Sequence, residues 1–418
     1  MKRVDVAIVG AGPGGAATAL YAGRAGLNVL LLDKASFPRE KTCGDGITCR
    51  SLSQLAHMGL EQDVLAKGLL PTQVRFGSPD GTLAALEMSP RGGERPFVCV
   101  YPRERLDEAL VRAAEQAGAV FRPGVRALGM EYGPSDVVLH TASRRTGENI
   151  HAHIVVAADG ALGSFSQRAG IPSPGGLYLA ARAYVKADDQ YPSCLDFMFC
   201  RDTLPFYAWV FPVAPGLCNV GLVVPPARAT GAALRGHLER LIASEPRIRR
   251  RLIGARLASP VRAGWLRSQR RLCRVYGKRW ISVGDAAGLV APISGEGIAT
   301  ALLSGRLAAQ TIVDALATDR PDESLASYEM RLQERLGRSF SRLWLAHYVF
   351  YAAPLVNRIV RLLRDERDVQ RLARAILLDQ APPESVLHVG FWWRLLKKPR
   401  SVVLPAEPIT DDREGKTG

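Results

Sequence analysis

The most constraining feature of this sequence is a glycine-rich turn between a short apolar segment and an alanine-rich segment. Residues 4–9 predict a strand, residues 16–25 a helix and residues 29–32 a second strand. The turn at residues 10–15 reads GAGPGG, which is the G-x-G-x-x-G pattern of a dinucleotide-binding βαβ unit. The chain is therefore expected to begin with a Rossmann-like fold.

The glycines of this turn have separate mechanical roles. Gly10 permits the tight turn, Gly12 allows the backbone to approach a pyrophosphate, and Gly15 allows the helix to pack on the strand. The helix N-terminus then offers unpaired N–H groups to the phosphates. Asp33 closes the second strand, where its carboxylate can accept both ribose hydroxyls. Because a carboxylate there disfavours a 2′-phosphate, the pattern predicts FAD or NAD rather than NADP.

Three further segments favour FAD over NAD. Residues 156–164 read VAADGALGS, residues 280–288 read WISVGDAAG, and Arg103 stands just before a helix predicted over residues 106–117. Asp285 ends a predicted strand, where it can hydrogen-bond a ribityl hydroxyl. A helix that begins at Gly297-Ile298 can direct its dipole at the part of the flavin that becomes negative on reduction.

In this order the motifs resemble a family of FAD-dependent enzymes that includes aromatic hydroxylases, flavin halogenases and geranylgeranyl reductases. The resemblance covers about residues 1–320 and implies an FAD domain assembled from separated stretches of chain. It implies FAD contacts at the matching positions, which are Gly10, Gly12, Gly14, Gly15, Asp33, Arg103, Asp285, Gly297 and Ile298.

Residues 37–48, FPREKTCGDGIT, are similar to the P-x-x-K-x-C-G-x-G segment of geranylgeranyl reductases. The resemblance implies that Cys43, Gly44 and Gly46 lie along the flavin, with the thiol near the ring as a catalytic residue. Glycines at 44 and 46 permit a close approach of the backbone. Without the resemblance, a small buried residue is the favoured interpretation of Cys43.

A second segment, FYAWVFP at residues 206–212, is followed by NVG at 219–221 and looks like the reductases' Y-x-W-x-F-P motif. Tyr207, Trp209 and Phe211 alternate along a predicted strand and so share one face. We expect them to line an apolar substrate wall, with Tyr207 and Trp209 catalytic because ring faces stabilise developing positive charge. An aromatic core face is the alternative. Halogenases carry W-x-W-x-I-P here, so that branch is disfavoured.

The predicted fold class is α/β plus α+β. A Rossmann-like FAD-binding domain contains an inserted antiparallel-sheet substrate domain and precedes a C-terminal helical region. Alternating strand patterns over residues 70–100 and 177–265 suggest a sheet with one face over the flavin and the other outward. The predicted parts are 1–69, 101–170 and 268–322 for FAD, 70–100 and 171–267 for substrate, 323–400 for the helical region and 401–418 for a tail.

The chain as a whole is basic, with 55 Lys+Arg against 40 Asp+Glu and a net charge of +15. The C-terminal region carries much of this excess. Six arginines at helical spacing predict a basic stripe along one helix side: Arg358, Arg361, Arg364, Arg367, Arg371 and Arg374. Residues 391–398, FWWRLLKK, have the composition of an interfacial anchor. Peripheral contact with the cytoplasmic face of a membrane is one expectation, and a solvated basic face is the alternative. No nucleic-acid-binding module is recognised.

Other features bound the setting and the chemistry. Seven cysteines without a CxxC pair, among them Cys194 and Cys200 too far apart on one strand for a disulfide, predict a reducing, cytoplasmic compartment. The longest apolar run, residues 343–356, is shorter than the roughly 20 residues that span a bilayer. No metal-ligand cluster and no Ser-His-Asp arrangement stands out, so the chemistry is assigned to the flavin.

The leading hypothesis is FAD-dependent reduction of C=C bonds in the isoprenoid chain of a lipid, quinone or prenyl diphosphate. No second dinucleotide fingerprint is present, so NAD(P)H or another electron donor would bind transiently. The alternative is an FAD-dependent monooxygenase that hydroxylates or epoxidises an aromatic or polyketide product. A third, non-enzymatic hypothesis is a flavin-containing membrane-docking protein.

Overall fold

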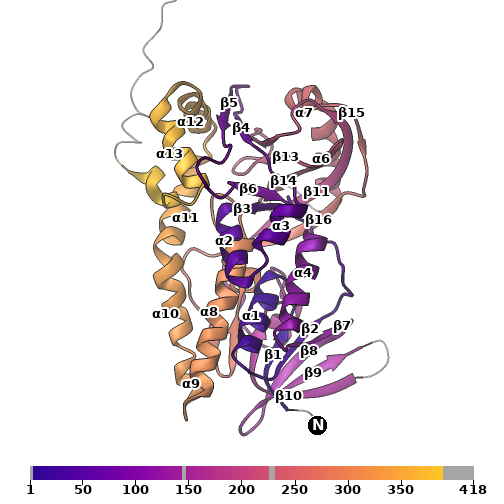
Figure 1. Cartoon of the computed structure of the whole chain (residues 1–418), viewed down its shortest axis with the longest axis vertical. Coiled ribbons are helices and arrows are strands. Elements are labelled where there is room, and N and C mark those ends of the chain that lie inside the picture. The colour runs from indigo at the N-terminus through magenta and orange to yellow at the C-terminus, as the bar shows by residue number, and fades with distance from the viewer. Residues whose placement is uncertain (1–2, 144–146, 226–230, 389–418) are drawn as a thin grey trace, which may run out of the picture.

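The computed structural model describes residues 3–143, 147–225 and 231–388. Two eight-stranded sheets follow each other along the long axis of the molecule, and the C-terminal helices run along one side of both (Figure 1). A two-stranded ribbon of β3 (Gly46–Thr48) and β6 (Val98–Val100) lies between the two sheets. The arrangement places the glycine-rich turns of the first sheet close to the second sheet.

The first sheet is mainly parallel. Its strands, in spatial order, are β17 (Tyr276–Gly277), β18 (Trp280–Ser282), β10 (Gly147–Ala157), β1 (Arg3–Val9), β2 (Val29–Asp33) and β7 (Val120–Pro123). Strand β1 pairs in parallel with both β10 and β2. On the far part of β10, strand β9 (Val137–Ala142) pairs antiparallel and is extended by β8 (Arg126–Tyr132). Because β1, β10 and β18 are parallel, the glycine-rich turns that follow them meet at one edge of the sheet.

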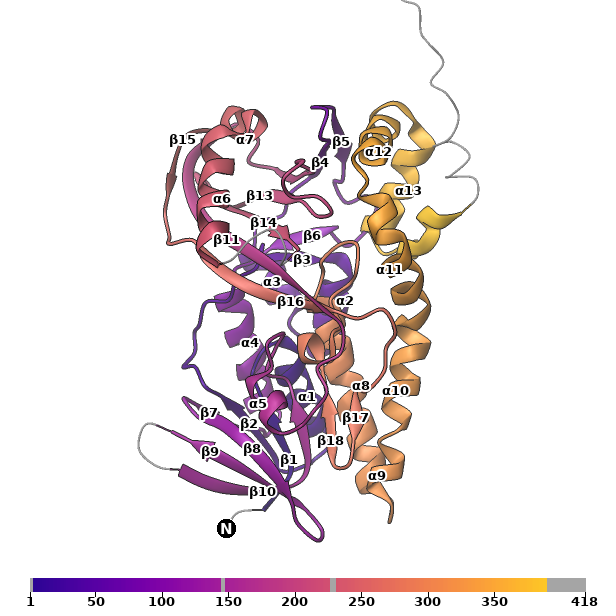
Figure 2. The same cartoon turned by 180° about the vertical axis from the view of Figure 1, so that it is seen from behind.

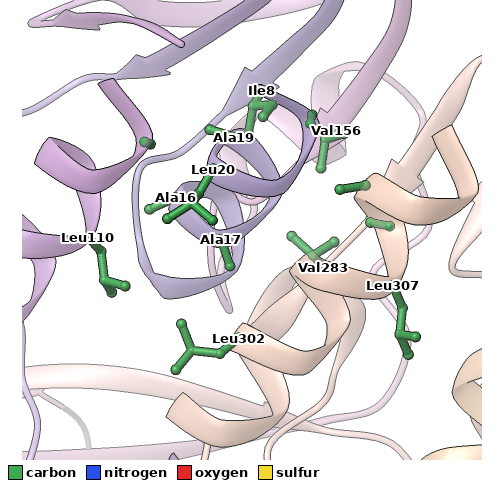
Figure 3. Packing of buried hydrophobic residues seen from close by; sticks show 14 of the residues in the cluster. Ile8, Ala16, Ala17, Ala19, Leu20, Leu110, Val156, Val283, Leu302 and Leu307 are labelled. Atoms are coloured by element: carbon green, nitrogen blue, oxygen red, sulfur yellow. The ribbon is translucent and has the colours of Figure 1, made fainter. Parts of the chain in front are cut away.

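Helix α1 (Pro13–Arg24) packs between α4 (Arg103–Gln116) and α8 (Ile298–Leu316). Its alanines allow this close packing, and Figure 3 shows them between Leu110 of α4 and Val283 and Leu302. A Cβ on Gly305 of α8 would lie 2.4 Å from the carbonyl oxygen of Gly14. Stretches far apart in the sequence therefore share one core, as expected for an FAD domain assembled from separated segments.

The second sheet is largely antiparallel. Its strands are β15 (Leu252–Leu257), β11 (Gly176–Asp189), β14 (Leu217–Val224), β13 (Ala208–Ala214), β12 (Cys194–Met198), β4 (Gln73–Gly77) and β5 (Leu83–Glu87), with β16 (Arg262–Ser268) also on β11. The exception is the pairing of β4 with β12, which is parallel. The sheet is therefore mixed rather than purely antiparallel.

The outer face of this sheet is covered, which corrects the expectation that it points outward. Helices α6 (Gly231–Ser244) and α7 (Pro246–Arg251) lie on it. Leu234 and Leu238 of α6 are fully buried against Ala181 and Val220 of the sheet. The reason is that both faces of these strands carry apolar side chains, so both must be shielded from water.

Smaller elements complete the first half of the molecule. They are α2 (Cys49–Met58), α3 (Glu61–Lys67), α5 (Ser164–Arg168) and a 3-10 turn at Gly284–Ala287. Beyond α8 the chain continues through α9 (Pro321–Ser324), α10 (Ser327–Leu332), a π turn at Gln333–Gly337 and α11 (Arg338–Phe350). These helices lead from the first sheet to the second (Figure 2). No helix among the described residues is long and apolar enough to cross a membrane.

The arginine stripe is divided between two helices, so the prediction of a single helix side is wrong. Helix α12 (Ala353–Asp365) ends before Glu366, whose backbone is extended, and α13 (Arg367–Leu377) begins after it. The break lets buried residues of both helices, such as Val360 and Val369, join one apolar cluster with strands β4 and β5. A 3-10 turn at Pro383–Leu387 ends the described chain.

Several of these arginines are paired. Arg361 forms an ion pair with Asp80, and Arg371 with Asp368. Arg374 donates to the carbonyl oxygens of Glu87 and Ser89 at 3.1 and 3.2 Å. Part of the basic stripe therefore fastens the helices to the sheet. The aromatic and basic segment at 391–398 lies outside the described residues.

Candidate cofactor and substrate site

The turn before α1 is an anion-binding arrangement. Gly12 is the N-cap of α1, and no side chain caps the helix or places an acid in its first turn. The free N–H groups there lack a side-chain acceptor, which is the donor set that a pyrophosphate accepts from. A Cβ on Gly12 would meet only the Arg39 guanidinium, at 3.7 Å. The turn is thus open to a ligand and has a cation beside it.

The other glycines of this turn allow neighbouring backbone segments to approach closely. Gly10 has a φ of +107°, and a Cβ there would lie 2.2 Å from the carbonyl oxygen of Ala158. A Cβ on Gly15 would lie 1.9 Å from the carbonyl oxygen of Gly10, and one on Gly14 would lie 3.0 Å from Val283. Gly10 and Gly15 are therefore required by the protein itself, whereas Gly12 is free to face the cofactor.

Asp33 lies beside the same turn. Its carboxylate accepts hydrogen bonds from the backbone N–H groups of Ala11 and Ala35, both at 2.9 Å. Arg39 stands 3.8 Å from Asp33 and 3.2 Å from Asp107. Each oxygen of Asp33 keeps a further lone pair, so its predicted contact with a ribose stays a prediction. Arg39 was missed because only its place in the fold shows that it faces the glycines.

The acid of the segment at residues 156–164 caps a helix. Asp159 accepts from the backbone N–H groups of Phe165 and Ser166, at 2.8 and 3.0 Å, and from the Ser166 hydroxyl. It thereby holds α5 against the end of β10. This role shapes the turn next to Gly10.

Arg103 lies deeper than a direct cofactor ligand would need to be. Arg103 is 5% exposed as a whole residue, and its guanidinium donates to both carboxylate oxygens of Asp107, at 2.8 and 2.9 Å. Burial works to lower the pKa of Arg103, but Asp107 and Cys43 together outweigh burial and raise that pKa. The Arg103 charge lies close to Cys43, whose thiol pKa is nonetheless raised by burial. Its predicted contact with FAD stays a prediction.

The segment at residues 37–48 (the Cys43 loop) and the segment at residues 206–212 (the aromatic strand) meet directly. A Cβ on Gly44 would lie 3.1 Å from the Phe211 ring and 3.3 Å from Nε1 of Trp209. A Cβ on Gly46 would lie 3.5 Å from the same Phe211 ring. The two segments that resemble geranylgeranyl reductases are thus packed against each other, although more than 150 residues separate them. A side chain at position 44 would require the Phe211 ring to shift by a few tenths of an ångström, so glycine suits this approach.

Asn219 joins these two segments by hydrogen bonds. Nε1 of Trp209 donates to Oδ1 of Asn219 at 2.9 Å. Nδ2 of Asn219 donates to the Cys43 carbonyl oxygen at 2.8 Å and to Oδ2 of Asp45 at 2.7 Å. The amide is fully buried, and its pairing with Phe211 across β13 and β14 places it. Asn219 stood out in the sequence as part of the NVG segment, but its role as a bridge between the two segments was not predicted.

Asp45 is a buried acid that sequence reasoning missed. The hydroxyl of Tyr184 donates to Oδ2 at 2.8 Å, and the backbone N–H of Arg103 donates to Oδ1 at 3.1 Å. Burial raises the pKa of Asp45, while the hydrogen bonds from Tyr184 and Asn219 oppose the rise. The residue stands between Gly44 and Gly46, and this position in the motif was the available signal.

A loop at residues 291–297 is held between the aromatic strand and α2. The hydroxyl of Tyr207 donates to the carbonyl oxygen of Ser294, and that of Tyr351 donates to Ile293 at 2.7 Å. On the other side, the Glu296 carboxylate accepts from the hydroxyl of Thr48. Burial raises the pKa of Glu296. The loop therefore has a defined position at the start of α8.

The start of α8 is a second uncapped helix N-terminus. Gly297 is its N-cap, Ile298 is its first residue, and no side chain caps it. Oδ1 of Asp285 lies 3.3 Å from the position of a Cβ on Gly297. The predicted Asp285, Gly297 and Ile298 are thus brought together. Two uncapped N-termini, one open glycine turn and a nearby carboxylate fit a cofactor with a pyrophosphate and a flavin.

The aromatic residues share one face, as predicted. Ring centroids are 6.4 Å apart for Tyr207 and Trp209 and 6.3 Å for Trp209 and Phe211. Phe197 packs edge-on against both Tyr207 and Phe211, at 5.2 Å. These rings belong to the apolar cluster that α12 and α13 cover. The predicted role of these rings as a substrate wall stays a prediction.

Comparisons with known proteins agree with this geometry. Residues 3–200 match the FAD binding domain family. A menaquinone reductase of Mycolicibacterium smegmatis is 31% identical over 81% of this chain and 82% of its own. A digeranylgeranylglycerophospholipid reductase of Methanopyrus kandleri is 30% identical over 93% of this chain and 99% of its own.

A solved structure shows the same fold. The crystal structure of a geranylgeranyl bacteriochlorophyll reductase-like protein from Thermoplasma acidophilum aligns with a TM-score of 0.78 and 24% identity. The alignment covers 93% of this chain and 99% of that one. The FAD-binding motifs, the relatives and the fold agree, and the chain belongs to the geranylgeranyl reductase family of FAD-dependent oxidoreductases.

Proposed function

We propose that this oxidoreductase saturates C=C bonds in the isoprenoid chain of a lipid, quinone or prenyl diphosphate. The observation that carries the proposal is the Asn219 bridge, which fastens the aromatic strand at Trp209 to the Cys43 loop. An apolar, ring-rich surface is thereby held against a loop that adjoins the cofactor cradle. Relatives named menaquinone reductase and digeranylgeranylglycerophospholipid reductase support the same class of substrate.

Each part of the site has a role in this reaction. FAD, when bound, supplies the electron pair that reduces the alkene. The uncapped N-terminus of α1 and Arg39 would hold its pyrophosphate, and Asp285 with the N-terminus of α8 would orient the flavin. The rings of Tyr207, Trp209 and Phe211 exclude water and favour positive charge at the alkene carbon.

Saturation also consumes a proton, and Glu296 is the candidate to hold it. Its carboxyl group accepts hydrogen bonds from the hydroxyls of Thr48 and Ser51. The hydroxyl of Tyr207 contacts the other side of the same loop, at residues 291–297. Because burial raises its pKa, the carboxyl keeps a proton to higher pH than a solvated glutamate does. Solvent would replace that proton after each turnover.

The test is anaerobic turnover with a chemical reductant. Holoenzyme reduced with dithionite is mixed with menaquinone, with a geranylgeranyl lipid or with geranylgeranyl diphosphate, and the products are weighed by mass spectrometry. We expect a gain of two hydrogens per double bond without oxygen. A strict need for oxygen and a product with one added oxygen atom would instead establish a monooxygenase.

A further inference from the structure

We propose that a basic cavity next to the Cys43 loop binds the pyrophosphate of a nicotinamide dinucleotide, the electron donor of the function proposed above. The cavity has a volume of about 530 Å³ and lies between the loop at residues 40–42, helix α6 and strand β16. Its charged lining consists of Lys41, Arg235, Arg262 and Glu40. Three cations against one carboxylate make it a site for an anion.

The single carboxylate is already shared by two arginines. Glu40 pairs with Arg262 at the cavity and with Arg182, whose Nη2 lies 3.2 Å away. The Arg182 side chain is 1% exposed, and among the described residues its Nε and Nη1 have no hydrogen-bond partner. Strands β11 and β16 place Arg182 directly opposite Arg262. Glu40 is thus divided between two guanidinium groups, which leaves the three cations that line the cavity short of an acceptor, and phosphate oxygens form strong charge-assisted bonds with such donors.

The cavity is separate from the FAD cradle. None of the glycines of the first turn, nor Asp285 or Gly297, lines it. The loop joins the two, because Lys41 lines the cavity and its Nζ lies 3.9 Å from the position of a Cβ on Gly160. Gly160 directly follows Asp159, which caps α5, and lies next to the glycine-rich turn at residues 10–15. A ligand in the cavity therefore adjoins the cofactor without occupying its place.

The cavity is also on the opposite side of the loop from the aromatic strand. Gly44 faces Trp209 and Phe211, whereas Thr42 packs on Gly264 of β16 beside the cavity. Figure 2 shows α6 and β16 away from α12 and α13, which cover the aromatic cluster. A diphosphate held here would be separated from the apolar surface by the loop. This position favours the donor over the head group of the isoprenoid substrate.

The electron balance is then complete. The dihydronicotinamide is oxidised to nicotinamide as one hydride passes to FAD, and the oxidised nucleotide leaves. The same two electrons later saturate one C=C bond, with protons supplied by solvent. Because the nucleotide arrives and leaves in each cycle, an open basic cavity suits it better than a second enclosed fold.

The experiment measures binding of NADP⁺ and NAD⁺ to holoenzyme by titration calorimetry. The test protein is the double variant Arg235→Ser/Arg262→Ser. The control is Arg240→Ser/Arg256→Ser, which removes two exposed arginines of α6 and β15 that do not line the cavity. Flavin content and the unfolding temperature establish that each variant is folded. Dithionite-driven saturation is assayed in parallel, so that failure of the proposed function is seen separately.

We expect the test variant to bind the better of the two nucleotides at least about tenfold more weakly, since two charge-assisted contacts are lost. The control should bind like the wild type, and dithionite-driven saturation should be unchanged in both. Equal loss in test and control, no loss in either, or no nucleotide binding by the wild type would overturn the proposal. So would weaker binding of geranylgeranyl diphosphate with nucleotide binding intact, which would assign the cavity to the substrate.

Discussion

Single buried polar residues hold the candidate site together. Asn219, Asp45 and Tyr184 form one chain of hydrogen bonds between the second sheet and the Cys43 loop. Asn219 and Asp45 are fully buried, so each bond that either of them loses leaves a partner without compensation. The site therefore depends on individual side chains more than its apolar surroundings suggest.

Replacing Asn219 by alanine should destabilise the protein by about 1–3 kcal/mol, because it leaves Nε1 of Trp209 and the Cys43 carbonyl oxygen without their partner. Urea unfolding of FAD-free protein measures the loss. Asn149→Ala is the matched control, since Asn149 is exposed and, within the described residues, its amide contacts the His140 side chain. Equal unfolding free energies for the two variants would contradict the bridging role.

His347 is a buried histidine among aromatic rings, with Phe206 and Tyr351 each 4.8 Å away between centroids. Burial lowers its pKa to about 4. In the unfolded chain the pKa is about 6.5, so only the unfolded state gains a proton between these values. This contribution to stability is present above about pH 6.5 and is lost as the pH falls toward 4, with a slope of up to about 1.4 kcal/mol per pH unit.

The variant His347→Phe should keep the ring packing and remove this slope. Unfolding free energies measured from pH 7 to pH 4.5 should fall less steeply than in the wild type. His57→Phe, on the exposed surface of α2, serves as control for the loss of one histidine. An unchanged slope in His347→Phe would show that the burial of His347 does not govern acid stability.

Among the elements, two helix N-termini converge on the proposed cofactor. Helices α1 and α8 pack against each other along their lengths and begin at Gly12 and Gly297, both without side-chain caps. Caps commonly stabilise a helix by about 1 kcal/mol, so two bare N-termini in one core are a cost that a bound anion can offset. We therefore expect the two helices to contribute to binding of the proposed cofactor through their N-termini rather than through their side chains.

Two alanine substitutions in the first turn should separate folding from cofactor binding. Gly15→Ala brings a Cβ to 1.9 Å from a backbone oxygen, so we expect a lower unfolding temperature even without FAD. Gly12→Ala has room and an extended backbone, so FAD-free stability should hold while the FAD dissociation constant rises. Differential scanning calorimetry and flavin fluorescence titration measure the two effects. Undiminished FAD affinity in Gly12→Ala would place the pyrophosphate elsewhere.

At the scale of the molecule, the C-terminal helices connect the two sheets along one side (Figures 1 and 2). Helices α12 and α13 cover the apolar cluster of the second sheet and are fastened by Arg361 and Arg374. An isoprenoid chain dissolves in a bilayer rather than in water. We therefore propose that the protein meets its substrate at a membrane surface through its basic C-terminal region.

Full-length protein should sediment with vesicles that contain anionic lipid and stay in solution with neutral vesicles. Each basic residue at such a surface contributes roughly 1 kcal/mol, and salt screens the attraction. The double variant Trp392→Ser/Trp393→Ser should bind more weakly if the predicted anchor inserts. Binding that is independent of lipid charge and of salt would refute the electrostatic part of the proposal.

Local patterns were sufficient for the Rossmann-like unit. Strand β1, helix α1 and strand β2 lie within a few residues of their predicted bounds, and α8 begins where expected. The family was likewise readable from motifs. These features could be predicted because glycine turns, short apolar strands and helix periodicity are set by neighbours in the chain.

Long-range packing decided the rest. The break at Glu366, the covered face under α6 and the parallel pairing of β4 with β12 depend on which apolar surfaces meet. Arg39, Asp45, Asn219 and the basic cavity are meaningful only because distant strands bring their partners close. By itself the sequence determined a flavin-binding βαβ unit and a reductase-like pair of motifs. Only the tertiary structure showed that those motifs touch, because hydrogen bonds across more than 150 residues leave no local periodicity to read.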